Sequence, residues 1–155
     1  MIAKTEISNQ NQFYLTGISV RTTNQNGQSQ IDIGGLWTKF TTEELIKQIK
    51  DRTSDDMYCI YTDYETDRTG PYTAILGCKV SSLDNVPDGF AGITIPADKY
   101  QVYYLEGQFP ANIGDAWQQI WASGIDRKYT ADYDFYKADP KSFEETEARI
   151  YLAVK

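Results

Sequence analysis

Aromatic side chains and carboxylates are the groups in this sequence that are best suited to chemistry. The chain holds 12 Tyr, 6 Phe and 3 Trp, and its 22 acidic residues outnumber its 15 basic ones. Aromatic rings attract organic cations by about 0.5–2 kcal/mol per contact. A carboxylate in a pocket of low polarity adds a stronger attraction for a cation that enters. A site that combines the two would bind hydrophobic cations.

Asp134 is a carboxylate in a strongly aromatic setting. Strand alternation places it on one face with Asp132 and Tyr136, while Tyr133 and Phe135 take the other face. Two interpretations follow from this pattern alone. Asp134 faces solvent while the aromatic neighbours are buried, or it lies in a pocket, where its charge needs partners because an unpaired buried carboxylate is costly.

The composition excludes several classes of catalytic site. The chain has no histidine, which rules out a Ser-His-Asp triad, a Cys-His pair and an imidazole metal site. Cys59 and Cys78 are too few for a cysteine-rich zinc site, and we expect them to be buried thiols. No glycine-rich phosphate-binding pattern is present. We therefore expect no metal and no cofactor.

The charge of the chain argues against nucleic acids and membranes as partners. Its net charge is −7, and it carries no basic patch that would offset repulsion from phosphates or anionic lipid. No apolar run approaches the roughly 20 residues of a membrane span. The first six residues turn polar without the apolar core of a signal peptide. We expect a cytoplasmic protein without direct nucleic-acid or membrane contact.

Apolar periodicity predicts the elements that position these groups. Strands are predicted over residues 13–21, 57–63, 72–81, 91–95, 101–106, 132–136 and 148–154. Helices are predicted over 31–40 and 111–123. A new N-cap at Thr41 predicts that helical structure continues to about residue 50.

The order strand, Trp-bearing helix, strand, strand occurs twice, with Trp37 and Trp117 at matching places. We predict an α+β fold of tandem duplicated β-α-β-β modules, in which an antiparallel sheet and two main helices surround a central ligand cleft. Residues 1–155 would form a single domain, with pseudo-repeat halves at about 12–82 and 90–155.

A series of short motifs runs in order through nearly the whole chain. The first half contains WTKF at 37–40, YTDYE at 61–65 and GCKV at 77–80. The second half contains PDGF at 87–90, GDAWQQIW at 114–121, DFY at 134–136 and IYLAV at 150–154. This series resembles the GyrI-like small-molecule-binding domain, which is also called the AraC-type effector-binding domain.

The resemblance implies paired β-α-β-β modules around a central pocket. Many members bind hydrophobic cations among aromatic side chains around one buried carboxylate, usually a Glu in a pattern like Phe-Glu-x-Tyr. Here the matching stretch is Tyr133-Asp134-Phe135-Tyr136, so the carboxylate would be Asp134, which is one methylene shorter. The last strand also departs from the family, with Ala153 where a Pro is common.

We expect the ligand-binding residues to be Asp134, Tyr136, Tyr151, Tyr104, Tyr61, Trp37 and Trp117. Within the adjacent pairs, Tyr104 is preferred to Tyr103 and Tyr61 to Tyr64, because strand neighbours face opposite ways. Core packing is the alternative role for each of these aromatic residues.

The resemblance predicts a stand-alone protein that binds hydrophobic, cationic aromatic molecules and is linked to transcription regulation or to drug sensing and sequestration. No helix-turn-helix precedes the first predicted strand, so a regulatory output would pass through a protein partner, such as a regulator or gyrase. One alternative is a hydrolase of cyclopropane-type antibiotics, with Asp134 as general base. Another is a gyrase-inhibitor-type protein. We favour binding over catalysis and assign no catalytic residue.

Overall fold

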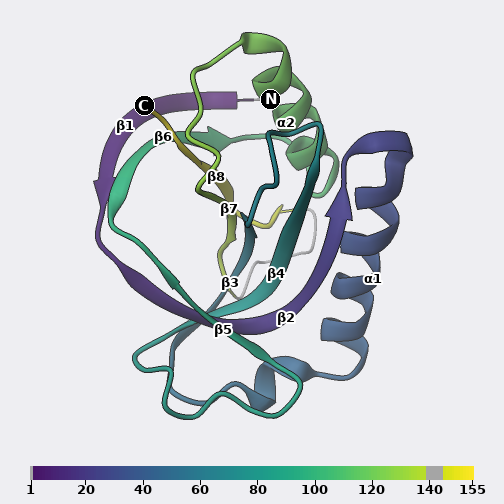
Figure 1. Cartoon of the computed structure of the whole chain (residues 1–155), viewed down its shortest axis with the longest axis vertical. Coiled ribbons are helices and arrows are strands. Elements are labelled where there is room, and N and C mark those ends of the chain that lie inside the picture. Colours follow the sequence, from purple (N-terminus) through teal and green to yellow (C-terminus); the bar gives the residue numbers. More distant parts are fainter. Residues whose placement is uncertain (1, 139–144) are drawn as a thin grey trace.

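The structure is a computed structural model that describes residues 2–138 and 145–155 (Figure 1). Within these ranges eight strands form one antiparallel sheet, in the spatial order β1-β6-β8-β7-β3-β4-β2-β5. The strands are β1 (Ile2–Gln10), β2 (Phe13–Thr23), β3 (Arg52–Thr62), β4 (Pro71–Val80), β5 (Ala91–Ile95), β6 (Asp98–Leu105), β7 (Ala131–Tyr136) and β8 (Ala148–Ala153). The helices are α1 (Gln28–Thr42), α2 (Ala111–Ser123) and the short 3-10 helices η1 (Gln25–Gly27) and η2 (Leu45–Gln48).

The sheet repeats one order of strands in its two halves. In the first half β4 lies between β3 and β2, and in the second half β8 lies between β7 and β6. The halves meet where β3 pairs with β7. The strand that leads into each half pairs with the other half, since β1 lies beside β6 and β5 lies beside β2. This repetition supports the interpretation as a duplicated β-α-β-β unit.

Both helices pack on one face of the sheet. Leu36 and Phe40 of α1 join a core with side chains of β2, β3 and β4, and Ala116 and Ile120 of α2 join a core with β6 and β8. Figure 1 shows α1 along the β2 flank and α2 at the top of the view. The other face of the curved sheet buries its own aromatic and aliphatic side chains, among them Tyr133.

The predicted fold class is confirmed, and the second helix has the predicted bounds. The predicted continuation of helix to residue 50 is wrong, because Glu44 takes a positive φ of 50° and only the four-residue η2 follows. Strand β1 was not predicted because its residues are mostly polar and show no alternation of apolar and polar types, and its apolar Ile7 is 57% exposed.

Cys59 and Cys78 are buried free thiols, as predicted. Among the residues that the structure describes, no helix combines the length and the apolar character needed to cross a membrane.

Candidate ligand-binding site

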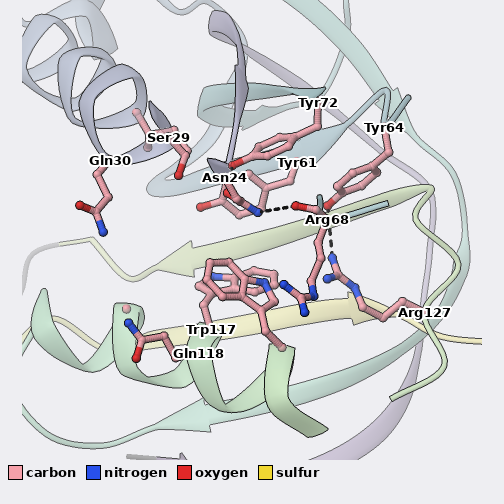
Figure 2. A pocket seen from close by; sticks show the side chains of 13 residues that line it. Asn24, Ser29, Gln30, Tyr61, Tyr64, Arg68, Tyr72, Trp117, Gln118 and Arg127 are labelled. Carbon is pink, nitrogen blue, oxygen red and sulfur yellow. Dashed lines mark hydrogen bonds between the residues drawn. The ribbon is translucent and has the colours of Figure 1, made fainter. Parts of the chain in front are cut away.

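A cavity of about 180 Å³ opens between α1 and α2 on the helix-covered face of the sheet (Figure 2). Its aromatic lining is Tyr61, Tyr64, Tyr72, Trp117 and Trp121. Its polar lining is Asn24, Ser29, Gln30, Gln118, Arg68 and Arg127. The aromatic side chains come from the ends of β3 and β4, from the segment that joins these strands and from α2. The two halves of the chain therefore build the cavity together.

The aromatic side chains of the lining contact one another, and Tyr61 makes two of these contacts edge to face. The Tyr61 ring lies 5.6 Å from Trp117 at an interplanar angle of 89°, and 6.0 Å from Tyr72 at 83°. Trp121 lies 6.5 Å from Trp117, one helical turn further along α2. Edge-to-face contacts of this kind fix ring orientation, so the wall presents ring faces and edges in set positions.

Asp134 lies directly behind this wall. Its side chain is 1% exposed and accepts hydrogen bonds from Tyr61 Oη at 2.5 Å, Trp117 Nε1 at 2.9 Å and Tyr136 Oη at 3.0 Å. Burial raises the pKa of Asp134 to about 6, and the three hydrogen bonds oppose that rise. Within the described part of the chain, no Lys or Arg forms an ion pair with this carboxylate.

Two of the three donors to Asp134 are themselves cavity-lining side chains. A hydrogen bond donated to a carboxylate polarises the donor, so Tyr61 and Trp117 become richer in electron density than isolated rings. Richer rings attract cations more strongly. The negative charge of Asp134 therefore reaches the cavity through the two rings that shield it.

A second carboxylate on the same face of β7 is paired with an arginine. Asp132 accepts hydrogen bonds from Arg127 Nη2 at 2.8 Å, Tyr64 Oη at 2.6 Å and the Ala153 backbone N–H at 2.8 Å. Arg127 is 6% exposed, and its Nε and Nη1 have no hydrogen-bond partner among the described residues. Desolvation lowers the pKa of Arg127, but the Asp132 carboxylate more than offsets this and holds that pKa above its ordinary value.

Five of the seven expected site residues gather at the cavity. Tyr61 and Trp117 line it. Asp134 and Tyr136 form the layer behind, and Trp37 packs edge to face on Tyr136 with ring centroids 5.0 Å apart. The tryptophan of α1 thus supports the site from behind, whereas the tryptophan of α2 forms its wall.

Tyr151 lies on the opposite face of the sheet. Asp134 is paired in register with Ile150, so Ile150 shares the helix-covered face and the next residue points away from it. Tyr151 stacks on Tyr133 at 4.5 Å.

Tyr104 also lies on the face opposite the cavity. Tyr103 is in register with Ile150 and packs against α2, which turns Tyr104 away. The Tyr104 hydroxyl donates to Glu6 at 2.5 Å. The register between neighbouring strands decides both placements, and it cannot be read from one strand's alternation.

Tyr64, Trp121 and Arg127 line the cavity but were not among the predicted site residues. Tyr64 reaches the same cavity as Tyr61 because β3 ends at Thr62 and Asp63 turns the chain with a positive φ of 51°. Trp121 lies four residues after Trp117 on the same helical stripe, which was a usable signal. Arg127 lies outside the regular strands, where periodicity gives no orientation.

The tandem sheet, with an aromatic cavity between its two helices, defines a small-molecule effector-binding domain. Residues 6–154 match the family model of Cass2, integron-associated effector binding protein, and the chain belongs to this family.

Three proteins are similar over nearly the whole chain. An integron cassette protein from the mobile metagenome of Vibrio cholerae has a TM-score of 0.78 and 29% identity, covering 99% of this chain and 97% of that one. SAV2435, solved with bound tetraphenylphosphonium, has a TM-score of 0.81 and 17% identity, covering 98% and 94%. The candidate transcriptional regulator YobU of Bacillus subtilis is 24% identical over 90% of each chain.

Proposed function

We propose that this protein binds small aromatic cations in the cavity between α1 and α2. The observation that carries the proposal is Asp134, a buried carboxylate without a cationic partner among the described residues, held behind the aromatic wall of an open cavity. Membership of an effector-binding family supports it, and so does the tetraphenylphosphonium bound to SAV2435.

The energetics favour a cation with delocalised charge. Such an ion is weakly hydrated, so it loses little hydration free energy when it enters the cavity. Each ring face that it contacts then attracts it by about 0.5–2 kcal/mol. Asp134 is shorter than the glutamate of related domains and stays behind Tyr61 and Trp117. The cation therefore contacts the two polarised rings, and the carboxylate acts on it through them.

The biological output that we propose is sensing or sequestration of the ligand, with any effect on transcription passing through a protein partner. The likeness to the candidate regulator YobU supports a regulatory setting. The net charge of −7 supports a protein partner over direct contact with DNA.

The geometry gives less support to a hydrolase. A general base must lie within hydrogen-bonding reach of the proton that it removes. The side chains of Tyr61 and Trp117 separate Asp134 from the cavity, and three donors already occupy its oxygens.

The test is a titration with tetraphenylphosphonium, followed by tryptophan fluorescence, in the wild type and in Asp134→Asn. The variant keeps the shape of the side chain and removes its charge, so we expect binding to weaken about tenfold, or roughly 1.4 kcal/mol. Glu43→Gln removes one negative charge from an exposed position outside the cavity and should leave the affinity unchanged. Equal affinities of wild type and Asp134→Asn would contradict the proposal.

A further inference from the structure

The charged side chains that line the cavity are both arginines. Arg68 and Arg127 belong to its lining, whereas the carboxylates of Asp132 and Asp134 lie behind it. The charged side chains of the cavity wall are therefore positive, although the chain as a whole has a net charge of −7. A ligand in the cavity therefore meets positive charge directly and negative charge only through polarised rings.

Arg127 has hydrogen-bond donors that no residue in the described ranges accepts from. Its Nη2 is bound to Asp132, but Nε and Nη1 are buried without a partner among the described residues. The guanidinium group lies 4.4 Å from the Tyr129 ring centroid and 5.6 Å from that of Trp117, so aromatic faces hold it in place. Buried donors without acceptors are costly, typically about 1–3 kcal/mol each, and an acceptor on a ligand would remove that cost.

Arg68 supplies a second positive charge, which helps to hold the pKa of the neighbouring Asp67 carboxylate below its ordinary value. It is partly buried, forms no ion pair within the described residues, and lies 5.7 Å from the Trp121 ring centroid. The Asn24 side chain donates to the Arg68 carbonyl oxygen at 3.1 Å and fixes its backbone. Figure 2 shows both guanidinium groups on the same side of the pocket, close to the tryptophan rings.

We propose that the ligand carries an acidic group, of the carboxylate class, in addition to its cationic aromatic system, and that Arg68 and Arg127 bind that group. This inference rests on the proposed function of the same cavity. Guanidinium groups bind carboxylates in a planar, two-pronged geometry. An anionic group on the ligand would also supply the acceptor that Arg127 Nε and Nη1 lack among the described residues.

A matched pair of dyes tests the inference. An unalkylated rhodamine with a free carboxylate and the methyl ester of the same dye share one cationic ring system and differ in the acidic group. Fluorescence anisotropy gives the affinity of the full chain for each. We expect the free acid to bind about tenfold more tightly than the ester, as two charge-assisted hydrogen bonds allow.

The preference should depend on the arginines. Arg68→Met keeps the aliphatic stem and removes the charge, so it should weaken binding of the free acid about tenfold and should not weaken binding of the ester. Arg127→Lys keeps a charge beside Asp132 but loses the planar fork, so it should reduce the preference without abolishing ester binding. Lys50→Met removes an exposed positive charge outside the cavity and serves as the control.

The outcomes separate this inference from the proposed function. Equal affinities of the wild type for the two dyes, or a preference that survives in Arg68→Met, would overturn the acidic-group inference while ester binding still supports the cation site. Failure of both dyes to bind would contradict the cation site and this inference with it.

Discussion

At the scale of single residues, the ionisation of Asp134 decides the chemistry of the site. Burial raises its pKa to about 6. Because the folded-state pKa lies above the unfolded value, this group stabilises the fold fully below about pH 4 and loses that contribution as the pH rises to about 6. The loss amounts to roughly 3 kcal/mol. The protein thus retains a carboxylate whose charge costs stability, as expected for a group kept for binding.

Binding of a permanent cation should follow the ionisation of Asp134. The affinity for tetraphenylphosphonium should fall about fivefold as the pH drops from about 7.5 to about 5, because protonation of Asp134 removes the attracting charge. Burial raises the pKa values of the neighbouring Tyr61, Tyr136 and Cys59, so these groups stay neutral throughout. Fluorescence titrations at several pH values measure the profile. If the affinity of Asp134→Asn depends on pH in the same way, the ionisation of another group would be responsible.

The Arg127–Asp132 pair should behave as a buried ion pair. Arg127→Met leaves the fully buried Asp132 without its cation and should lower the free energy of unfolding by about 3–5 kcal/mol. Adding Asp132→Asn removes the orphaned charge and should recover part of that loss. Urea unfolding of the two variants measures both effects. A loss below about 1 kcal/mol in Arg127→Met would show that water reaches the pair.

At the scale of elements, the junction between α1 and η2 carries local strain. Glu44 has a positive φ of 50°, and its exposed ion pair with Lys47 contributes little. Glu44→Gly should therefore raise the free energy of unfolding by about 0.5–1 kcal/mol. Glu43→Gly, at a neighbour with an ordinary negative φ of −91°, should lower it instead. Urea unfolding checks both, and stabilisation by Glu43→Gly would contradict this explanation.

Periodicity in the sequence was sufficient for most elements and for part of the site. The alternating stretches predicted seven of the strands, and the apolar stripe of Trp117 and Ile120 predicted α2. Strand β1 could not be predicted, because edge pairing with β6 stabilises it without a buried side-chain pattern. The face of the sheet on which Tyr104 and Tyr151 lie depends on the register between neighbouring strands. That register is set by the assembled sheet and not by the sequence of one strand. Arg68 and Arg127 lie in connections, where no period applies.

At the scale of the whole molecule, the cavity belongs to neither half alone. Tyr61 comes from the first half, and Trp117 and Asp134 come from the second, across the β3–β7 pairing that joins them. Strand β1 precedes the first half but pairs with β6 of the second, and β5 precedes the second half but pairs with β2 of the first. The two modules should therefore unfold together, and a ligand between α1 and α2 should stabilise both.

Ligand binding should raise the stability of the entire chain. At a concentration of about 100 times its dissociation constant, tetraphenylphosphonium should add about 2.7 kcal/mol to the free energy of unfolding. Differential scanning calorimetry should then show one transition that shifts upward as a unit. Two transitions, of which only one shifts, would contradict a site shared by both halves.

The most direct measurement compares two ions of the same shape and opposite charge. Calorimetric titration of the wild type with tetraphenylphosphonium and with tetraphenylborate isolates the sign of charge that the cavity selects. The phosphonium should bind about tenfold more tightly than the borate. The ratio of the two affinities should be smaller in Asp134→Asn. Equal or tighter binding of the borate would contradict an aromatic cation site with Asp134 behind its wall.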